Sequence, residues 1–256
     1  MSKPVIIAVT NQKGGVGKTT TAINVAYYLA KAGKKTLLVD LDPQGNATSG
    51  LGVDKSKIEK SVIDLLVGDS RLADVTIKTK HKNLSLIPTT SHLANTEVEL
   101  ASLNNKFVRL KQGLVDDDTY DFILIDSPPS LSLLTVNSLI AAHYVVLPVQ
   151  AEFYAMEGLG QLLETMKLVR KGMNPSLELL GVLVTMLDSR TSLSKQVHEE
   201  IKKHFPGKVL ETTIPRNIRL AEAPSHGLPI GAYERWSKGA RAYKAATKEI
   251  LNRTGA

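Results

Sequence analysis

The chain has 256 residues, of which 43% are hydrophobic and 22% charged, and its formal net charge is +7. A chain of this length buries a sizeable core, and the absence of cysteine excludes disulfides, iron–sulfur clusters, thiolate zinc sites and cysteine nucleophiles. No apolar stretch approaches the roughly 18 residues of a membrane-spanning helix, and the apolar run Val5–Val9 is too short for a signal peptide. Composition therefore predicts a soluble, cytoplasmic protein.

Short apolar runs alternate with helical stretches along the whole sequence. We expect strands at Val5–Thr10, Thr36–Asp40, Leu84–Pro88, Phe122–Asp126, Tyr144–Val149, Leu180–Thr185 and Val209–Ile214. We expect helices at Thr19–Ala32, Leu131–Ala142, Glu157–Lys171, Leu193–His204 and Ser237–Leu251. Most of these strands are continuously apolar, as in a parallel sheet that is covered on both faces. The pattern predicts an α/β fold with a doubly wound, mostly parallel sheet, in a single domain over residues 1–256, with ligands at the carboxyl ends of the strands.

A glycine-rich loop follows the first predicted strand and precedes the first predicted helix. The loop and the start of the helix comprise Asn11, Gln12, Lys13, Gly14, Gly15, Val16, Gly17, Lys18, Thr19 and Thr20. Glycines let successive backbone N–H groups point at a phosphate, and the helix N-terminus faces the same anion. In such a loop the Lys18 ammonium reaches the outer phosphates of a nucleotide, and the Thr19 hydroxyl ligates Mg²⁺. The sequence therefore predicts a nucleotide-phosphate site here.

The loop departs from the common phosphate-binding pattern at its start. Gln12 stands where that pattern has glycine, and a second lysine, Lys13, follows it. With these residues the sequence resembles the deviant Walker A family of P-loop ATPases, and within it the ParA/Soj branch of chromosome- and plasmid-partitioning proteins. The resemblance implies an ATP-dependent homodimer in which Lys13 reaches the partner's phosphates. An added cation there would offset the charge on the transferred phosphoryl group.

Aspartates follow two of the predicted strands. The second strand leads into Asp40 and Asp42, and a later apolar strand ends in Asp126. Since the carboxyl ends of neighbouring parallel strands meet at one edge of a sheet, we expect these carboxylates to share a crevice with the loop. Asp126 has the Walker B arrangement and is predicted to hold Mg²⁺, directly or through water. The resemblance implies that Asp42 orients the attacking water and that Asp40 lies near the Mg²⁺ shell, so Lys13, Lys18 and Asp42 are the predicted catalytic residues.

Two later segments resemble nucleotide-contacting parts of the same family. The residues Pro215, Arg216 and Asn217 follow the last predicted strand, and the resemblance implies that they pack on the adenine. From the residues alone, the segment reads equally as a proline turn that leads to a helix capped by Asn217. Glu152 resembles a family residue that touches the nucleotide across the dimer. These four residues complete the expected ATP-binding set.

The positive charge is concentrated at the C-terminal end. Residues 190–256 contain 13 basic and 6 acidic residues, a difference that equals the net charge of the whole chain. Such a region indicates a polyanionic partner, nucleic acid or an anionic membrane, or else a solvated lysine-rich surface. The resemblance favours nonspecific double-stranded DNA, with Arg190, Lys195 and Arg219 as contacts. Few aromatic residues accompany these charges, which favours contact with the DNA backbone over base stacking.

The same family has two further branches with other functions. A MinD-like, membrane-associated positioning ATPase would end in an amphipathic helix with large apolar residues. Here the apolar residues of 240–252 are mostly alanine with Tyr243, Ile250 and Leu251, which fits docking on the body of the protein better than entry into lipid. The nitrogenase-reductase branch is excluded because its cluster needs cysteine ligands. No helix-turn-helix is expected before the first strand.

The partitioning resemblance implies a cycle as well as a fold. ATP and Mg²⁺ would close the homodimer, and the dimer would bind DNA on the nucleoid. Hydrolysis would be slow in the isolated protein, as in other switch NTPases, and faster with a centromere-bound, ParB-like partner. Hydrolysis would then separate the subunits and release the DNA.

Overall fold

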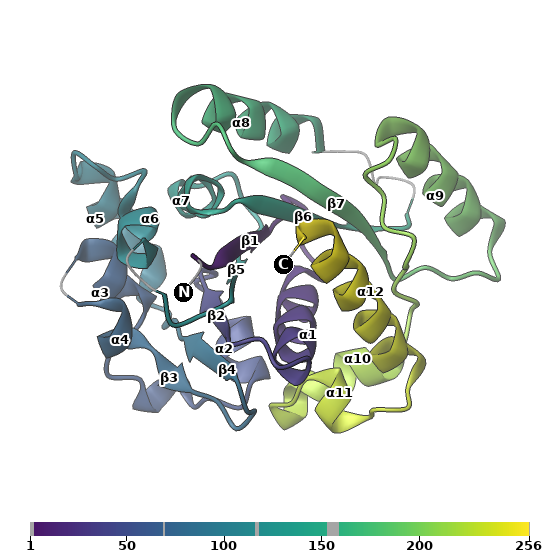
Figure 1. The fold of residues 1–256 in the computed structure, drawn as a ribbon, viewed down its shortest axis with the longest axis horizontal. Coiled ribbons are helices and arrows are strands. Elements are labelled where there is room, and N and C mark those ends of the chain that lie inside the picture. The colour runs from purple at the N-terminus through teal and green to yellow at the C-terminus, as the bar shows by residue number, and fades with distance from the viewer. Residues whose placement is uncertain (1–2, 69, 116–117, 153–158, 256) are drawn as a thin grey trace.

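The computed structural model describes residues 3–68, 70–115, 118–152 and 159–255. Within these ranges one 7-stranded sheet has the order β3-β4-β2-β5-β1-β6-β7 (Figure 1). The strands are β1 (Val5–Val9), β2 (Thr36–Asp40), β3 (Ile77–Lys78), β4 (Leu84–Ile87), β5 (Phe122–Asp126), β6 (Tyr144–Gln150) and β7 (Glu178–Thr185). All neighbours pair in parallel except β3 and β4. The expected α/β fold with a mostly parallel sheet is confirmed.

Helices cover both faces of this sheet (Figure 1). One layer contains α1 (Lys18–Lys31), α2 (Asn46–Gly50), α10 (Ile218–Glu222), α11 (Ile230–Tyr233) and α12 (Lys238–Thr254). The other contains α3 (Val62–Val67), α4 (Leu72–Val75), α5 (Leu93–Ser102), α6 (Arg109–Leu114), α7 (Leu133–Ala141), α8 (Leu159–Gly172) and α9 (Ser192–His204). Within the described residues there are also two 3₁₀ turns, η1 (Lys55–Lys57) and η2 (Ala223–His226).

The first strand shows why the sheet needs two helical layers. Ile7 and Val9 pack among the helices of the α1 and α12 layer, whereas Ile6 and Ala8 pack among those of the other layer. Successive side chains of a strand point to opposite faces, so a continuously apolar strand is stable only when both faces are covered. The apolar runs of the sequence therefore predicted the central strands at nearly their observed positions.

One expected strand, Val209–Ile214, is wrong. The segment runs beside β7 and pairs with it at two separate places: a bridge joins Val182 and Val209, and the N–H of Ile214 donates to the carbonyl of Val184 at 2.8 Å. The reason is a competing partner: the carboxylate of Glu249 on α12 accepts hydrogen bonds from the backbone N–H groups of Glu211 (2.9 Å) and Thr212 (3.0 Å). These donors are directed to a side chain, so the pairing with β7 is interrupted between Leu210 and Ile214 and no continuous ladder forms.

The last helix docks on the body of the protein, as expected. The buried side chains of α12 include Tyr243 and Ile250, and the Tyr243 hydroxyl lies 3.1 Å from the hydroxyl of Thr21 on α1. The two helices lie side by side in Figure 1. Among the described helices, none is both long enough and apolar enough to cross a membrane. The expected helix Glu157–Lys171 begins outside the described residues, which resume at Leu159.

Candidate nucleotide-binding site

The predicted site residues meet at the carboxyl edge of the sheet. In the register of the strands, Asp126 at the end of β5 lies opposite Asp40 at the end of β2 and opposite Val9 at the end of β1. The glycine-rich loop follows β1 directly and leads into Lys18, the first residue of α1. The structure therefore brings the loop and both carboxylates to one edge, as the parallel topology requires.

The backbone of the loop needs its glycines. Gly15 and Gly17 have φ of 75° and 87°, in the left-handed region that residues with a Cβ rarely adopt. A Cβ placed on Gly14 or Gly15 would meet no atom within 4 Å, so the space above the loop is open. The loop therefore has room for a ligand that approaches its backbone N–H groups closely.

Two side chains that sequence reasoning missed hold the loop in this shape. The buried Asn11 amide donates to the carbonyl of Pro148 on β6 (2.7 Å), while its Oδ1 accepts the N–H of Lys13 (3.0 Å). The Thr185 hydroxyl, at the end of β7, donates to the carbonyl of Val16 (2.8 Å). Asn11 stands within the motif and could have been singled out as a turn-stabilising asparagine. Thr185 carries no signal in the sequence.

Lys18 is buried at the base of the loop. Its Nζ donates to the carbonyl of Lys13 at 3.0 Å. Burial lowers the pKa of Lys18, and the nearby carboxylates of Asp126 and Asp42 oppose this shift. Burial disfavours this ammonium, and among the described residues its one hydrogen-bond partner is a loop carbonyl, so an anion placed above it would stabilise it.

Asp126 is the most unusual group of the site. It is fully buried, and neither carboxylate oxygen has a hydrogen-bond partner in the described part of the chain. Burial and then the charge of Asp40 raise the pKa of Asp126 well above its ordinary value, with Thr19 and Lys18 acting in the opposite direction. Two hard oxygens with unmet coordination, next to a threonine hydroxyl, fit a small divalent cation such as Mg²⁺.

The donor set also agrees with Mg²⁺ in its small number of protein ligands. Within the described ranges no group of three or more His, Cys, Asp or Glu side chains could hold a metal ion by itself. Mg²⁺ in nucleotide sites takes one or two protein ligands and completes its shell with water and phosphate oxygens. Thr19 and Asp126 as the protein ligands of Mg²⁺ stay a prediction.

Asp40 differs from Asp126 because its oxygens are already engaged. The hydroxyl and the N–H of Thr48 both donate to Oδ2 at 2.7 Å, and the N–H of Asp42 donates to Oδ1 at 3.3 Å. The Thr48 hydroxyl in turn accepts the N–H of Thr89 at 3.1 Å. Burial raises the pKa of Asp40 to about 6 although the bonds from Thr48 and the N–H of Asp42 favour its charged form. Its place near the Mg²⁺ shell stays a prediction; its contacts are those of a residue that positions Asp42.

Asp42 begins a loop whose conformation is held by several further contacts. It is buried, and its Oδ1 accepts the N–H of Gln44 at 3.0 Å. The Lys55 ammonium donates to the carbonyl of Gln44, and its Cε would lie 2.7 Å from a Cβ built on Gly45. Gly45 has φ of 62°, so its backbone conformation favours glycine, and a larger side chain there would displace the end of Lys55. Thr48 and Lys55 are thus functional candidates that sequence reasoning missed, since only the folded chain places them here.

The structure brings Glu152 to the loop within one chain. Its carboxylate lies 3.8 Å from the Lys13 ammonium and 3.7 Å from the Arg216 guanidinium, and it accepts a hydrogen bond from the Gln150 amide. Both lysine and glutamate side chains are partly exposed, and such ion pairs contribute little stability. Whether these residues act across a dimer stays a prediction.

The segment from Pro215 to Asn217 lies beside the end of β7. Pro215 forms a bridge with Leu187, and the N–H of Arg216 donates to the carbonyl of Leu187 at 3.2 Å. Asn217 occupies the N-cap position of α10, but its side chain makes no cap hydrogen bond. Its buried Oδ1 has no partner among the residues described. The capping interpretation therefore holds for the position and not for the side chain.

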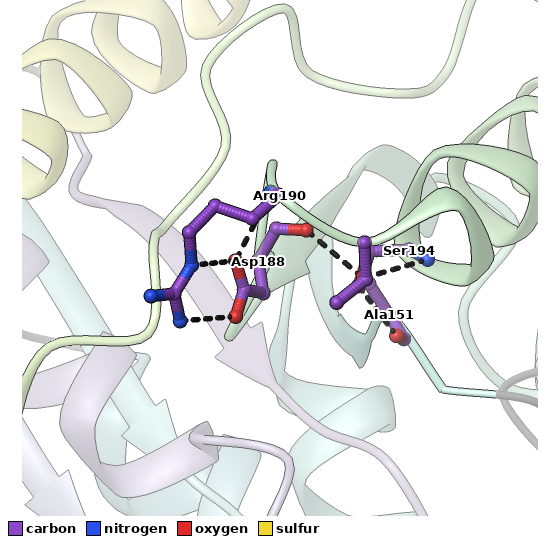
Figure 2. A network of polar contacts seen from close by, with 5 residues as sticks. Ala151, Asp188, Arg190 and Ser194 are labelled. Carbon is purple, nitrogen blue, oxygen red and sulfur yellow. Dashed lines mark hydrogen bonds and ion pairs between the residues drawn. The ribbon is translucent and has the colours of Figure 1, made fainter.

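The three expected DNA contacts lie on separate elements and differ in their pairing. The Arg190 guanidinium makes two hydrogen bonds to the Asp188 carboxylate, at 2.9 and 2.8 Å, and its backbone N–H makes a third at 3.1 Å, just before α9 (Figure 2). These bonds lower the pKa of Asp188 to about 2. The Arg219 guanidinium donates to Glu222 at 2.8 Å. Lys195 is exposed on α9 and has no ion pair within the described ranges. The DNA-contact role of all three stays a prediction.

Known proteins resemble this chain in sequence and in structure. The family model described as AAA domain matches residues 4–179. The sporulation initiation inhibitor protein Soj of Bacillus subtilis (strain 168) is 55% identical over 246 residues, covering 96% of this chain and 97% of that protein. The chromosome-partitioning ATPase Soj of Treponema pallidum (strain Nichols) is 50% identical, covering 96% of each chain.

Among solved structures, cobyrinic acid a,c-diamide synthase from Mycobacterium smegmatis, with a bound ATP analog and magnesium, has a TM-score of 0.87. It is 37% identical, and the match covers 99% of this chain and 96% of that one. The fold thus agrees with that of these relatives. The chain belongs to the AAA-domain family and, with its sequence relatives, to the Soj/ParA family of partitioning P-loop ATPases.

Proposed function

We propose that this protein is an ATP-operated switch that closes into a homodimer around ATP and Mg²⁺ and then binds nonspecific double-stranded DNA. The observation that carries the nucleotide part is Asp126, whose buried oxygens lack partners in the described chain beside an open glycine loop. An uncompensated buried carboxylate costs several kcal/mol of folding free energy, on the order of 3–5 kcal/mol when a partner is removed. Its presence makes sense where a ligand completes it.

Different groups of the protein would have different roles in binding and hydrolysing the nucleotide. The backbone N–H groups of the loop and the Lys18 ammonium would bind the phosphates. Mg²⁺, held by Thr19 and Asp126, would neutralise charge on the outer phosphates when bound. Asp42, held through its N–H by Asp40, would orient the attacking water. Lys13 would leave Glu152 and turn to the partner's phosphates, an exchange that a weak, partly exposed ion pair permits.

The adenine would lie against the segment that follows β7. Pro215 and Asn217 offer an apolar ring and a side-chain amide, and the buried Asn217 Oδ1 lacks a partner in the described structure. An adenine amino group is a donor that would satisfy this oxygen. Arg216, linked to Glu152, would connect the adenine side of the site to the phosphate loop.

The DNA part rests on the C-terminal positive charge. Arg190, Lys195 and Arg219 would bind the DNA backbone, and two copies of this surface in a dimer would span more phosphates than one subunit, so ATP would control affinity. A centromere-bound, ParB-like protein would speed hydrolysis and release the DNA. The protein would then work in the cytoplasm in association with the nucleoid.

Binding of a fluorescent, random-sequence DNA duplex tests this proposal. The measurement compares Mg²⁺-ATP, Mg²⁺-ADP and no nucleotide over a series of potassium chloride concentrations. We expect binding with ATP only, and we expect it to weaken steeply as salt rises. Asp42→Ala should keep the ATP-bound protein on DNA, whereas Lys18→Ala should abolish both ATP binding and DNA binding. Equal binding in all three nucleotide states would contradict a switch.

The same assay separates the alternative function. Vesicles of anionic phosphatidylglycerol are added in place of DNA. Binding to these vesicles with ATP, and none to DNA, would replace the proposal with a membrane-associated positioning ATPase.

A further inference from the structure

A second concave surface lies at the far end of α1 from the nucleotide loop. A hollow of about 820 Å³ is bounded by the C-terminal half of α1, by α11 and by α12. Its wall on the α11 side is tightly packed: a Cβ on Gly231 would lie 2.5 Å from the Tyr27 ring and 2.6 Å from the Tyr28 hydroxyl. The two tyrosine rings contact each other edge to face at 5.2 Å. This groove is a formed feature of the fold, because buried residues on both sides fix its walls.

The rim of the groove is cationic. Five basic side chains line it, namely Lys31, Arg235, Arg241, Lys244 and Lys248, and no described carboxylate lines it with them. None of the five forms an ion pair within 4.0 Å in the described chain. Several like charges around one hollow repel each other, and an anionic partner relieves that repulsion.

The floor of the groove is apolar. Its exposed apolar surface comes from Ala32, just after α1, and from Ala245 and the half-buried Leu251 on α12; Leu29 of α1 also lines the groove but is fully buried. Trp236 stands at the edge with 70% of its surface exposed, and the Arg235 guanidinium lies 4.5 Å from the centre of its ring. An exposed tryptophan next to an arginine is a combination that is enriched at the energetic centres of protein–protein interfaces.

We propose that this groove binds an acidic amphipathic helix of a partner protein. The apolar side chains of such a helix, spaced three and four residues apart, would lie on the floor between α1 and α12, and its carboxylates would reach the basic rim. A DNA duplex would satisfy the rim, but its backbone has no apolar side chains for the floor. The charge of the rim and the apolar floor together therefore favour a peptide over nucleic acid.

The proposal is separate from the nucleotide switch. No residue of the groove belongs to the phosphate loop, the strand-end carboxylates or the Pro215–Asn217 segment. Binding is therefore expected in the absence of nucleotide. Failure of the peptide experiment would leave the ATP and DNA proposal untouched, and the reverse also holds.

Intrinsic fluorescence provides a local test because Trp236 is the single tryptophan of the chain. The probe is a synthetic helical peptide with leucine at positions i, i+3, i+4 and i+7 and glutamate at most others. We expect a saturable change of Trp236 fluorescence without nucleotide, and weaker binding as salt rises. Matched peptides with glutamine for glutamate, or with serine for leucine, should each bind at least about 10-fold more weakly.

Protein variants then locate the site. Lys244→Glu with Lys248→Glu should reduce peptide affinity at least about 10-fold. Lys167→Glu with Lys171→Glu is the control, because it makes the same charge change at the same i,i+4 spacing on exposed positions of α8. Ala245→Phe should reduce peptide binding by occupying the floor without changing charge. Circular dichroism and ATP binding verify that each variant is folded.

Three outcomes would overturn the proposal. The first is no response of Trp236 to the acidic leucine peptide. The second is equal binding of the leucine peptide and the serine peptide, which would mean that charge alone acts. The third is that the DNA duplex, or phosphatidylglycerol vesicles, bind the groove with a Lys244 and Lys248 dependence that the peptide lacks.

Discussion

The strand-end site and the C-terminal basic surface both hold charged side chains, but their charges are satisfied in opposite ways. Asp126 and Lys18 are buried, and Asp126 has no hydrogen-bond partner in the described chain. Arg190 and Arg219 have 87% and 50% of their side chains exposed, and each is held by a carboxylate two or three residues away.

The difference predicts how strongly each region depends on its ligand. A buried charge without a partner costs folding free energy until a ligand binds it. Substituting such a residue should therefore have large effects on stability and on ligand binding. An exposed pair contributes little because water screens it, and a phosphate competes with the carboxylate for the arginine on nearly equal terms. Ligand dependence should therefore be steep at the strand ends and graded on the surface.

The largest effect is expected for Asp126→Asn. Mg²⁺-dependent ATP hydrolysis should fall by about 100-fold or more, because the variant lacks the charged oxygens that fit the cation. The metal-free protein should at the same time gain about 1–3 kcal/mol of unfolding free energy, because a neutral amide is less costly to bury than an unpaired carboxylate. Hydrolysis assays and urea unfolding without Mg²⁺ measure the two effects.

The sign of the pH dependence follows from the raised pKa of Asp126. A carboxyl whose pKa is raised on folding destabilises the protein at a pH above that raised value, and the destabilisation disappears as pH falls toward the ordinary value near 3.8. The stability gain of Asp126→Asn should thus be largest at a pH above the raised pKa of Asp126 and shrink as pH falls toward 3.8. The exposed Asp118→Asn is the control; a pH-independent gain would contradict the interpretation.

An intermediate effect is expected for Thr48→Val. The change removes the hydroxyl that donates to Asp40 and accepts from the N–H of Thr89, and so loosens the carboxylate that holds the N–H of Asp42. Hydrolysis should fall by about 10-fold, while ATP affinity changes less than about 3-fold. Thr48→Ser retains the hydroxyl and should keep most of the activity. Equal losses in both variants would show that the methyl group matters and the hydrogen bond does not.

The smallest effect is expected where the charge is exposed and paired. Asp188→Asn releases Arg190 from its carboxylate and should raise affinity for duplex DNA by about 2- to 5-fold in the ATP state. Arg190→Ala should lower affinity and reduce the salt slope by about one per subunit. Glu164→Gln, which releases Lys167 on α8, makes the same charge change away from this surface and should leave DNA binding unchanged. Equal gains in Asp188→Asn and Glu164→Gln would mean that net charge alone acts.

Much of the fold could be predicted because the central strands are uninterrupted apolar runs. The strands ending at Asp40 and Asp126 were predicted with their observed bounds. The short antiparallel β3 (Ile77–Lys78) was missed, because two residues carry no pattern. The segment at Val209 was misassigned, because the sequence does not show that Glu249 would take its N–H groups.

The residues of the candidate site also divide into those that the sequence predicted and those that only the folded chain reveals. The sequence predicted the loop, Lys18 and the strand-end aspartates, because these residues directly follow predicted strands. Their residue types and their order along the chain were sufficient to place them in one site. Thr48, Thr185 and Lys55 were missed, because each acts on a backbone or carboxylate group that only folding brings near. The pairing of Arg190 with Asp188 lies two residues apart and was within reach of the sequence.

A mostly parallel α/β sheet and a phosphate loop at its carboxyl edge could be inferred from the sequence, because both depend on residues that are neighbours in the chain. Apolar runs, glycines with left-handed φ and a lysine before the helix act locally. Which buried charges find a partner depends on the folded chain. In the described part of the chain, Asp126 has no hydrogen-bond partner, whereas Asp40 accepts hydrogen bonds from Thr48. It also gathered residues of α1 and α12, more than 200 positions apart, around one basic groove. Those outcomes depend on long-range packing, which sets where each polar group finds its partner.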